Sequence, residues 1–187
     1  MKGFLSILLV ADKKTQVTDL SQIVAASTAG KLYATDHDVM VVCNGCDEKI
    51  WSDISALINK MDNARGVRLA GEVDPDMAIL EGLHRSIGDA VLIGSVQDIS
   101  LDLAEEIVNR SQEGHEVVIA QPRIGSTLTN LDAMDYGTRL LSRAAVHYVL
   151  HSGGSRKGIY HLLPRHELFN PIMVEYSACD HPAKNVI

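Results

Sequence analysis

The chain has 187 residues, a formal net charge of −7 at pH 7, and a composition that is 46% hydrophobic and 22% charged. This length suits one domain with a sizeable core, and the apolar content excludes a disordered chain. The mild acidity argues against a general nucleic-acid-binding protein, which needs a basic face. No apolar run reaches the roughly 20 residues that cross a bilayer, so we expect no transmembrane segment. Three cysteines cannot form a disulfide framework, which favours a cytoplasmic protein.

Short apolar runs alternate with segments of helical periodicity along most of the chain. The first run is interpreted as a buried strand rather than a signal peptide, because it ends at polar residues without a small-residue cleavage site. Runs of this kind predict five strands: Phe4–Val10, Asp38–Cys43, Val67–Ala70, Ala90–Gly94 and Glu116–Ala120.

Helices are predicted where apolar residues recur every three or four positions. These segments run from Val17 to a stop at Gly30, from Ile50 to Met61, from Met77 to Ile87, from Ser100 to Gly114, and from Leu140 to Tyr148. The alternation predicts an α/β fold with three α/β/α layers and a mostly parallel sheet. We expect residues 1–150 to form the core. Residues 151–187, where prolines interrupt any long helix, are expected to form a cap or tail of the same domain.

Cys43 and Cys46 form a C-x-x-C pair directly after the second predicted strand. The pair could be a redox couple at a helix start, or half of a zinc site completed near Cys179. The alternative is a plain strand-to-helix turn that uses Asn44 and Gly45 as turn residues. Structural zinc sites favour wider ligand spacing than the residues around Cys179 offer, which favours the turn.

Carboxylates follow two of the predicted strands, with Asp47 and Glu48 after the second and Asp98 after the fourth. In an open α/β sheet, ligands bind at the carboxyl ends of the strands. Oxygen ligands at this edge could hold a divalent metal that bridges two phosphates. The same residues also suit helix starts, where negative charge is favoured. The sequence leaves both interpretations open.

Five segments, taken in chain order, resemble the motifs of glycosyltransferase family 2, the nucleotide-sugar enzymes with the GT-A fold that include dolichyl-phosphate mannosyltransferase-like proteins. They are Ser6–Lys14, Asp38–Glu48, Ala78–Ile93, Glu113–Arg123 and Gly137–Val146, within about residues 4–150. The second segment, D-V-M-V-V-C-N-G-C-D-E, is similar to the family's E-I-I-V-V-D-D-G-S-x-D strand. The resemblance implies a GT-A fold and the transfer of a sugar from a UDP- or GDP-linked donor to an acceptor hydroxyl or lipid phosphate.

The resemblance also implies a set of site residues. The implied nucleotide-sugar-binding positions are Ala11, Asp12, Asn44, Asp47, Glu48, Gln97, Arg139 and Arg143. Among these, the two arginines would pair with phosphate. Asp135 would be the general base for the acceptor, and Asp98 would be a ligand of a divalent metal, Mg or Mn. The family's metal-binding D-x-D is replaced here by Ser95-Val96-Gln97, which contains no carboxylate.

Three functions follow as hypotheses from these residues. The first is glycosyl transfer from a nucleotide-sugar donor. The second, which the substituted D-x-D favours chemically, is a catalytically inactive GT-A-like module for binding or assembly in polysaccharide or glycolipid synthesis. The third is a thiol redox protein that uses Cys43 and Cys46. The expected assembly is a homo-oligomer or a membrane-associated synthesis complex, with no nucleic acid partner.

Overall fold

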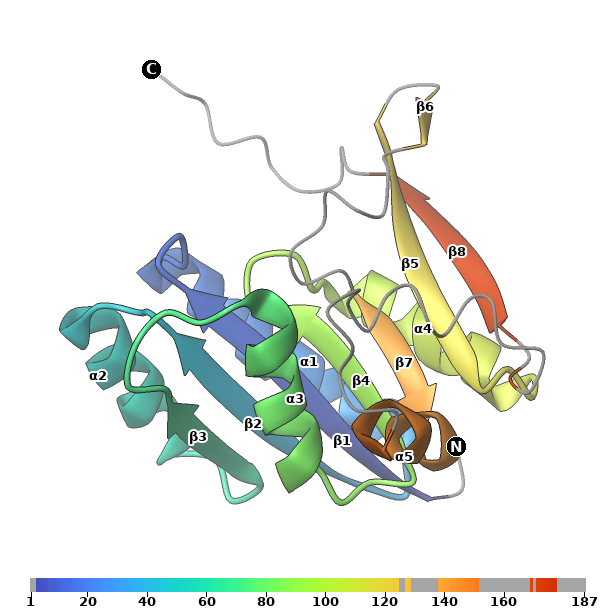
Figure 1. Cartoon of the computed structure of the whole chain (residues 1–187), viewed down its shortest axis with the longest axis horizontal. Coiled ribbons are helices and arrows are strands. Elements are labelled where there is room, and N and C mark those ends of the chain that lie inside the picture. The colour runs from blue at the N-terminus through green and yellow to red at the C-terminus, as the bar shows by residue number, and fades with distance from the viewer. Residues whose placement is uncertain (1–2, 125–126, 129–137, 152–168, 170, 178–187) are drawn as a thin grey trace.

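The computed structural model describes residues 3–124, 127–128, 138–151, 169 and 171–177. Its strands are β1 (Phe4–Asp12), β2 (Asp36–Asn44), β3 (Ala64–Arg68), β4 (Ala90–Ser95), β5 (Val117–Ile124), β6 (Thr127–Leu128), β7 (Arg139–Ser142) and β8 (Pro171–Ser177). Its helices are the 3-10 helix η1 (Val17–Leu20), α1 (Ser21–Tyr33), α2 (Glu48–Ile58), α3 (Pro75–Arg85), α4 (Leu101–Gln112) and α5 (Arg143–His151). Figure 1 shows one twisted sheet with helices on both faces.

The strands form one mixed sheet in the order β3-β2-β1-β4-β7-β5-β6, with β8 paired to β5. β1 pairs in parallel with both β2 and β4, and β2 pairs in parallel with β3. β7 is antiparallel to both of its neighbours, β4 and β5. From β1 the chain adds strands first on one side and then on the other, so the strand order reverses between β1 and β4.

Alternate side chains of β1 supply two separate cores, one on each face of the sheet. Leu5, Ile7 and Leu9 pack with residues of α1, α2 and α4. Leu8 and Val10 pack with residues of α3 and α5 on the opposite face. Because both faces are covered, the central strands are continuous apolar runs rather than alternating ones. The predicted three-layer α/β/α arrangement is confirmed.

Buried polar contacts join α1 to β2 near the amino end of the strand. His37 is 7% exposed, and its Nε2 lies 3.1 Å from the Ser27 hydroxyl and 2.7 Å from the Asn63 amide nitrogen. The amide nitrogen can only donate, so this ring nitrogen accepts and the imidazole is neutral. Burial lowers the pKa of His37, and the charge of Lys31 lowers it further.

Four of the five predicted strands are confirmed in place and order as β1, β2, β4 and β5, but β6, β7 and β8 were not predicted, and three further details were wrong. β3 covers Ala64–Arg68 rather than Val67–Ala70. α1 continues past Gly30 to Tyr33. Gly30 does not end the helix; it lies against the ring of His37, where a Cβ would overlap the ring. Leu140 belongs to β7 and not to the last helix, because it pairs with both β4 and β5.

β8, which falls within the predicted cap or tail, pairs in parallel with β5 and so belongs to the same sheet. The division of the chain at residue 150 stays a prediction. Among the described residues, no helix combines the length and the apolar content that crossing a bilayer requires.

Candidate functional site

The carboxyl ends of β1 and β4 lie at the point where the strand order reverses, which is where ligands bind in open α/β sheets. β1 ends at Asp12, β4 ends at Ser95, and Val10 pairs with Ser95 in register. The turn after β4 carries Gln97. Two residues that the sequence predicted as part of one site, Asp12 and Gln97, are therefore in direct contact although they are 85 positions apart.

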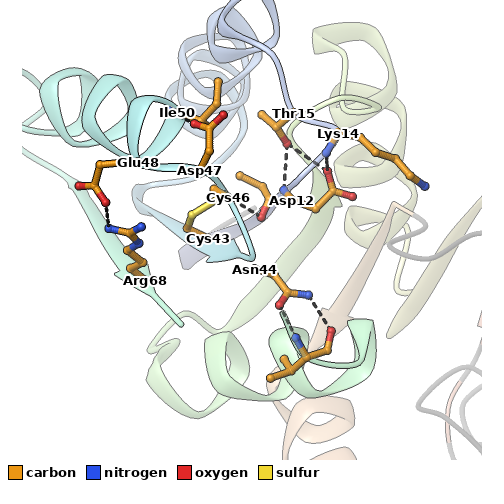
Figure 2. Close-up of a disulfide and its surroundings, with 12 residues drawn as sticks. Asp12, Lys14, Thr15, Cys43, Asn44, Cys46, Asp47, Glu48, Ile50 and Arg68 are labelled. Carbon is orange, nitrogen blue, oxygen red and sulfur yellow. Dashed lines mark hydrogen bonds and ion pairs between the residues drawn. A yellow bond between two sulfur atoms is a disulfide. The ribbon is translucent and has the colours of Figure 1, made fainter. Parts of the chain in front are cut away.

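Asp12, Thr15 and Gln97 form a hydrogen-bonded group at this point, which we call the switch-point cluster. The Gln97 amide nitrogen donates to Asp12 Oδ1 at 2.7 Å and to Thr15 Oγ1 at 3.1 Å. The Asp12 backbone N–H donates to Thr15 Oγ1 at 2.9 Å, and the Lys14 N–H donates to Asp12 Oδ1 at 2.8 Å (Figure 2). Thr15 is 5% exposed, whereas Asp12 and Gln97 are partly exposed. The cluster thus presents fixed polar groups at the edge.

Asn44, in register with Asp12 on the neighbouring strand, holds the loop between β3 and α3. Its amide nitrogen donates to the Val73 carbonyl oxygen at 2.9 Å, and its amide oxygen accepts from the Val73 N–H at 2.8 Å (Figure 2). The Asn44 side chain is inside the protein, with 1% exposure. In this structure the amide therefore positions a loop beside the switch-point cluster.

Cys43 and Cys46 are joined as a disulfide across the turn from β2 to α2, with their Cα atoms 5.7 Å apart. The predicted turn is confirmed, since Gly45 has a φ of +73°, which glycine adopts readily. Cys46 Sγ also lies 3.3 Å from the carbonyl oxygen of Ala11 at the end of β1 (Figure 2). Cys43 is 0% and Cys46 8% exposed, so both sulfurs are buried, and the redox use of this pair stays a prediction.

Asp47 and Glu48 are engaged in structural contacts at the start of α2. Asp47 is the N-cap residue, and its Oδ1 accepts from the Ile50 N–H at 2.7 Å. Glu48 forms an ion pair with Arg68 of β3 at 2.7 Å, on the exposed rim of the same edge (Figure 2). The helix-start interpretation of Asp47 is confirmed.

Asp98 lies on the exposed turn after β4, and the cap of α4 is Ser100, which accepts from the Leu103 N–H. The Ser95 hydroxyl is buried and accepts from the Gln97 backbone N–H at 3.1 Å. Within the described part of the chain, no three His, Cys, Asp or Glu residues are grouped so that they could hold a metal ion. The neutral side chains of Ser95 and Gln97 cannot balance the charge of Mg²⁺ or Mn²⁺ as two carboxylates would.

Arg139 and Arg143, which were predicted to bind phosphate together, are separated by the length of β7. Arg139 pairs with Ile93 towards the carboxyl end of β4 and is 2% exposed. Arg143 begins α5 at the opposite edge, where its guanidinium donates to the Gly88 carbonyl oxygen, from Nε at 2.7 Å. Since β7 runs antiparallel to β4, it leads the chain away from the switch-point cluster, and the structure does not bring Arg143 to this site.

An ion pair that the sequence did not indicate joins two loops at the carboxyl edge. Lys13 Nζ lies 2.9 Å from the Glu72 carboxylate, so the turn after β1 contacts the loop before α3. The hydrogen bond to Glu72 raises the pKa of Lys13. Gly45 packs against Glu72 between these loops. The predicted residues Asp135 and Cys179 lie outside the described residues.

Comparison with known proteins identifies the fold. No protein-family model and no curated protein matches the chain. Among solved structures, it is similar to 4-diphosphocytidyl-2C-methyl-D-erythritol synthase of Anaerococcus prevotii, with a TM-score of 0.62 at 17% identity over 92% of this chain and 86% of that one. It is also similar to M. tuberculosis glucosyl-3-phosphoglycerate synthase, with a TM-score of 0.63 at 14% identity over 94% and 71%. The chain has a GT-A-like fold.

Nucleotide-sugar transferases and nucleotidyltransferases share this GT-A-like fold. A mannosyltransferase of Pyrobaculum calidifontis, solved with GDP-Man and Mn²⁺, has a TM-score of 0.56 at 10% identity over 80% of this chain. The chain spans about half of that mannosyltransferase, 47%, and about half of the S. aureus TarS 1–349 structure, 48%. At these identities the similarity shows the fold alone, and what those proteins bind is known only of them.

Proposed function

We propose that the chain is a cytoplasmic glycosyltransferase of the family 2 type, which binds a UDP- or GDP-linked sugar at the carboxyl ends of β1 and β4. The observation that carries the proposal is the switch-point cluster, because it places Asp12 and Gln97 where the strand order reverses. Solved structures of this fold include one with UDP-GlcNAc and one with GDP-Man, which supports a nucleotide-sugar ligand.

The surrounding residues have separate tasks in this proposal. Asp12 and Gln97 contact the ligand, and Asn44 and Asp47 hold the loop and the helix that border it. Arg139, near the same edge, would favour the diphosphate through its fixed positive charge. An assembly as a homo-oligomer or within a membrane-associated synthesis complex belongs to the same proposal.

The reaction would be a displacement at the anomeric carbon of the donor sugar. An acceptor hydroxyl or lipid phosphate oxygen forms a bond to this carbon, while the bond to the nucleoside diphosphate breaks and the diphosphate leaves. A hydroxyl acceptor gives its proton to a general base, and Asp135 is the residue that we propose for this role.

Calorimetry with UDP, GDP, UDP-GlcNAc and GDP-Man tests the proposal. Loss of one ligand contact of about 1.4 kcal/mol weakens binding about tenfold, so Gln97→Ala should raise the Kd by about that factor. Gln112→Ala is the matched control, because the Gln112 amide contacts only the Tyr33 carbonyl oxygen among the described residues and lies on α4. Absence of binding by every nucleotide, or equal binding by Gln97→Ala and the wild type, would refute the proposal.

A second candidate function, nucleotidyl transfer, is favoured by the coverage of the solved structures. The chain spans 86% of the A. prevotii synthase and 90% of a CMP-2-keto-3-deoxy-manno-octonic acid synthetase, but about half of two larger transferases. A nucleotidyltransferase would release pyrophosphate from a nucleoside triphosphate, whereas a glycosyltransferase would release a nucleoside diphosphate from a nucleotide sugar. Tight binding with neither product would favour the inactive binding module.

A further inference from the structure

The hydrogen-bond capacity of the switch-point cluster determines what it can offer a ligand. Both N–H groups of the Gln97 amide are used, one by Asp12 Oδ1 and one by Thr15 Oγ1. Thr15 Oγ1 also accepts from the Asp12 backbone N–H, so its two lone pairs are occupied. These partners fix the orientation of the Gln97 amide, because a carboxylate oxygen can accept only from the amide nitrogen and not from the amide oxygen.

Asp12 Oδ1 is similarly saturated. It accepts from the Lys14 N–H at 2.8 Å and from the Gln97 amide at 2.7 Å, and the Thr15 hydroxyl donates to it more weakly at 3.4 Å. Two lone pairs of an oxygen atom serve two strong donors, so a cation could bind Asp12 Oδ1 only if one of these hydrogen bonds broke. Two acceptor atoms, Asp12 Oδ2 and Gln97 Oε1, have no hydrogen bond to any described residue and belong to partly exposed side chains.

Two acceptor atoms without a described partner, on side chains that are hydrogen-bonded to each other, match hydrogen-bond donors of a ligand. Phosphate oxygens carry negative charge and accept hydrogen bonds, so they are a poor match for a carboxylate and an amide oxygen. A divalent cation would bridge such groups, but it would find one carboxylate oxygen and one neutral oxygen, with the buried Ser95 hydroxyl engaged by Gln97. Sugar hydroxyls donate hydrogen bonds, need no cation and fit both atoms.

We propose that the switch-point cluster binds hydroxyl groups of the ligand's ribose or hexose directly, without a divalent cation. Gln97 stands where the family's motif has a metal-binding carboxylate, and its amide ties Asp12 and Thr15 into one hydrogen-bonded network. The identity of the ligand rests on the proposed function, whereas the absence of a cation site rests on the cluster alone. A mannosyltransferase with this fold was solved with GDP-Man and Mn²⁺, so Mn²⁺ is the cation to test for binding to this chain.

The first test titrates MnCl₂ alone into the full chain and follows bound Mn²⁺ by electron paramagnetic resonance and the melting temperature. The wild type should show no Mn²⁺ binding that depends on Asp12. Gln97→Asp places a second carboxylate beside Asp12 and should bind Mn²⁺ and melt at a higher temperature with it. Gln97→Asn is the matched control, because it has the same length without the charge, and should not respond.

Two results of this titration would overturn the proposal. The first is Mn²⁺ binding by the wild type that Asp12→Asn abolishes. The second is a Gln97→Asp protein that folds as the Gln97→Asn protein does and still binds no Mn²⁺, because the identity of residue 97 would then not decide cation binding.

The second test compares nucleotide binding in EDTA and in excess Mn²⁺. Dissociation constants should agree within about twofold, and binding about tenfold tighter with Mn²⁺ would contradict the proposal. UDP and its 2′,3′-dideoxy analogue should differ if the ribose supplies the hydroxyls, whereas UDP-GlcNAc and UDP should differ if the hexose does. Equality in both comparisons would contradict hydroxyl recognition. If no nucleotide binds, the proposed function fails, and the Mn²⁺ titration still decides whether this edge holds a cation.

Discussion

Replacing Asn44 by Ala should release the loop between β3 and α3 from the carboxyl edge of the sheet. The substitution removes two hydrogen bonds to Val73, of 2.9 and 2.8 Å, from a side chain that is 1% exposed. At about 1 kcal/mol for each bond, the loss is about 2 kcal/mol. Val73 is 40% exposed, so water can reach its backbone groups and no larger penalty is expected. For a domain of this size the melting temperature should fall by about 4–8 °C.

Urea unfolding measures the loss, and hydrogen exchange of the Val73 amide locates it, since this N–H should lose its protection while the amides of β1 keep theirs. Asn59→Ala is the control, because Asn59 is exposed at the end of α2, and it should change stability by less than about 0.5 kcal/mol. A loss below about 0.5 kcal/mol in Asn44→Ala, or unchanged exchange at Val73, would show that Asn44 does not hold the loop.

Two further predictions concern His37 and Asp47. The pKa of His37 is lowered in the folded protein, so the unfolded chain binds the proton more tightly. The contribution of neutral His37 to the free energy of unfolding is therefore fully present above about pH 6.5 and is lost as the pH falls. The free energy of unfolding should fall below pH 6.5 by up to about 1.4 kcal/mol per pH unit, and a His37→Gln curve parallel to the wild-type curve would contradict this reasoning. Asp47→Ala should cost about 1 kcal/mol in urea unfolding through loss of the helix cap. Asp47→Asn, which keeps an acceptor, should recover most of this stability, and equal losses in the two variants would mean that the charge matters rather than the cap.

The strands that the sequence predicts are those with a strong local signal. β1, β2 and β4 are continuous apolar runs because helices cover both of their faces. β3, with the sequence ARGVR, is only partly buried and has a weak apolar pattern, so its predicted position was displaced. β7 is four residues long and exists through pairing with strands that are distant in the sequence, and a periodicity read along the chain cannot detect such pairing.

The same contrast between local and long-range signals explains which parts of the candidate site could be predicted. The juxtaposition of Asp12 and Gln97 could be predicted, because parallel strands end at a common edge. Thr15 was missed, although its spacing after Asp12 is typical of a local side-chain-to-backbone turn. Arg139 and Arg143 are four residues apart, which would place them on one face of a helix, but Arg139 begins β7 and Arg143 begins α5 after the strand has ended.

The position of β7 between β4 and β5 has a consequence for the order in which the sheet can assemble. β1, β2, β3 and β4 are contiguous in the sheet and precede residue 96 in the chain, so this half can pair as soon as those residues are available. β5 follows in the sequence and pairs locally with the two-residue β6, but the strands along most of its length, β7 and β8, come later. During synthesis β5 must therefore wait without these partners, and β4 must keep an open edge, until residues 139–142 have left the ribosome.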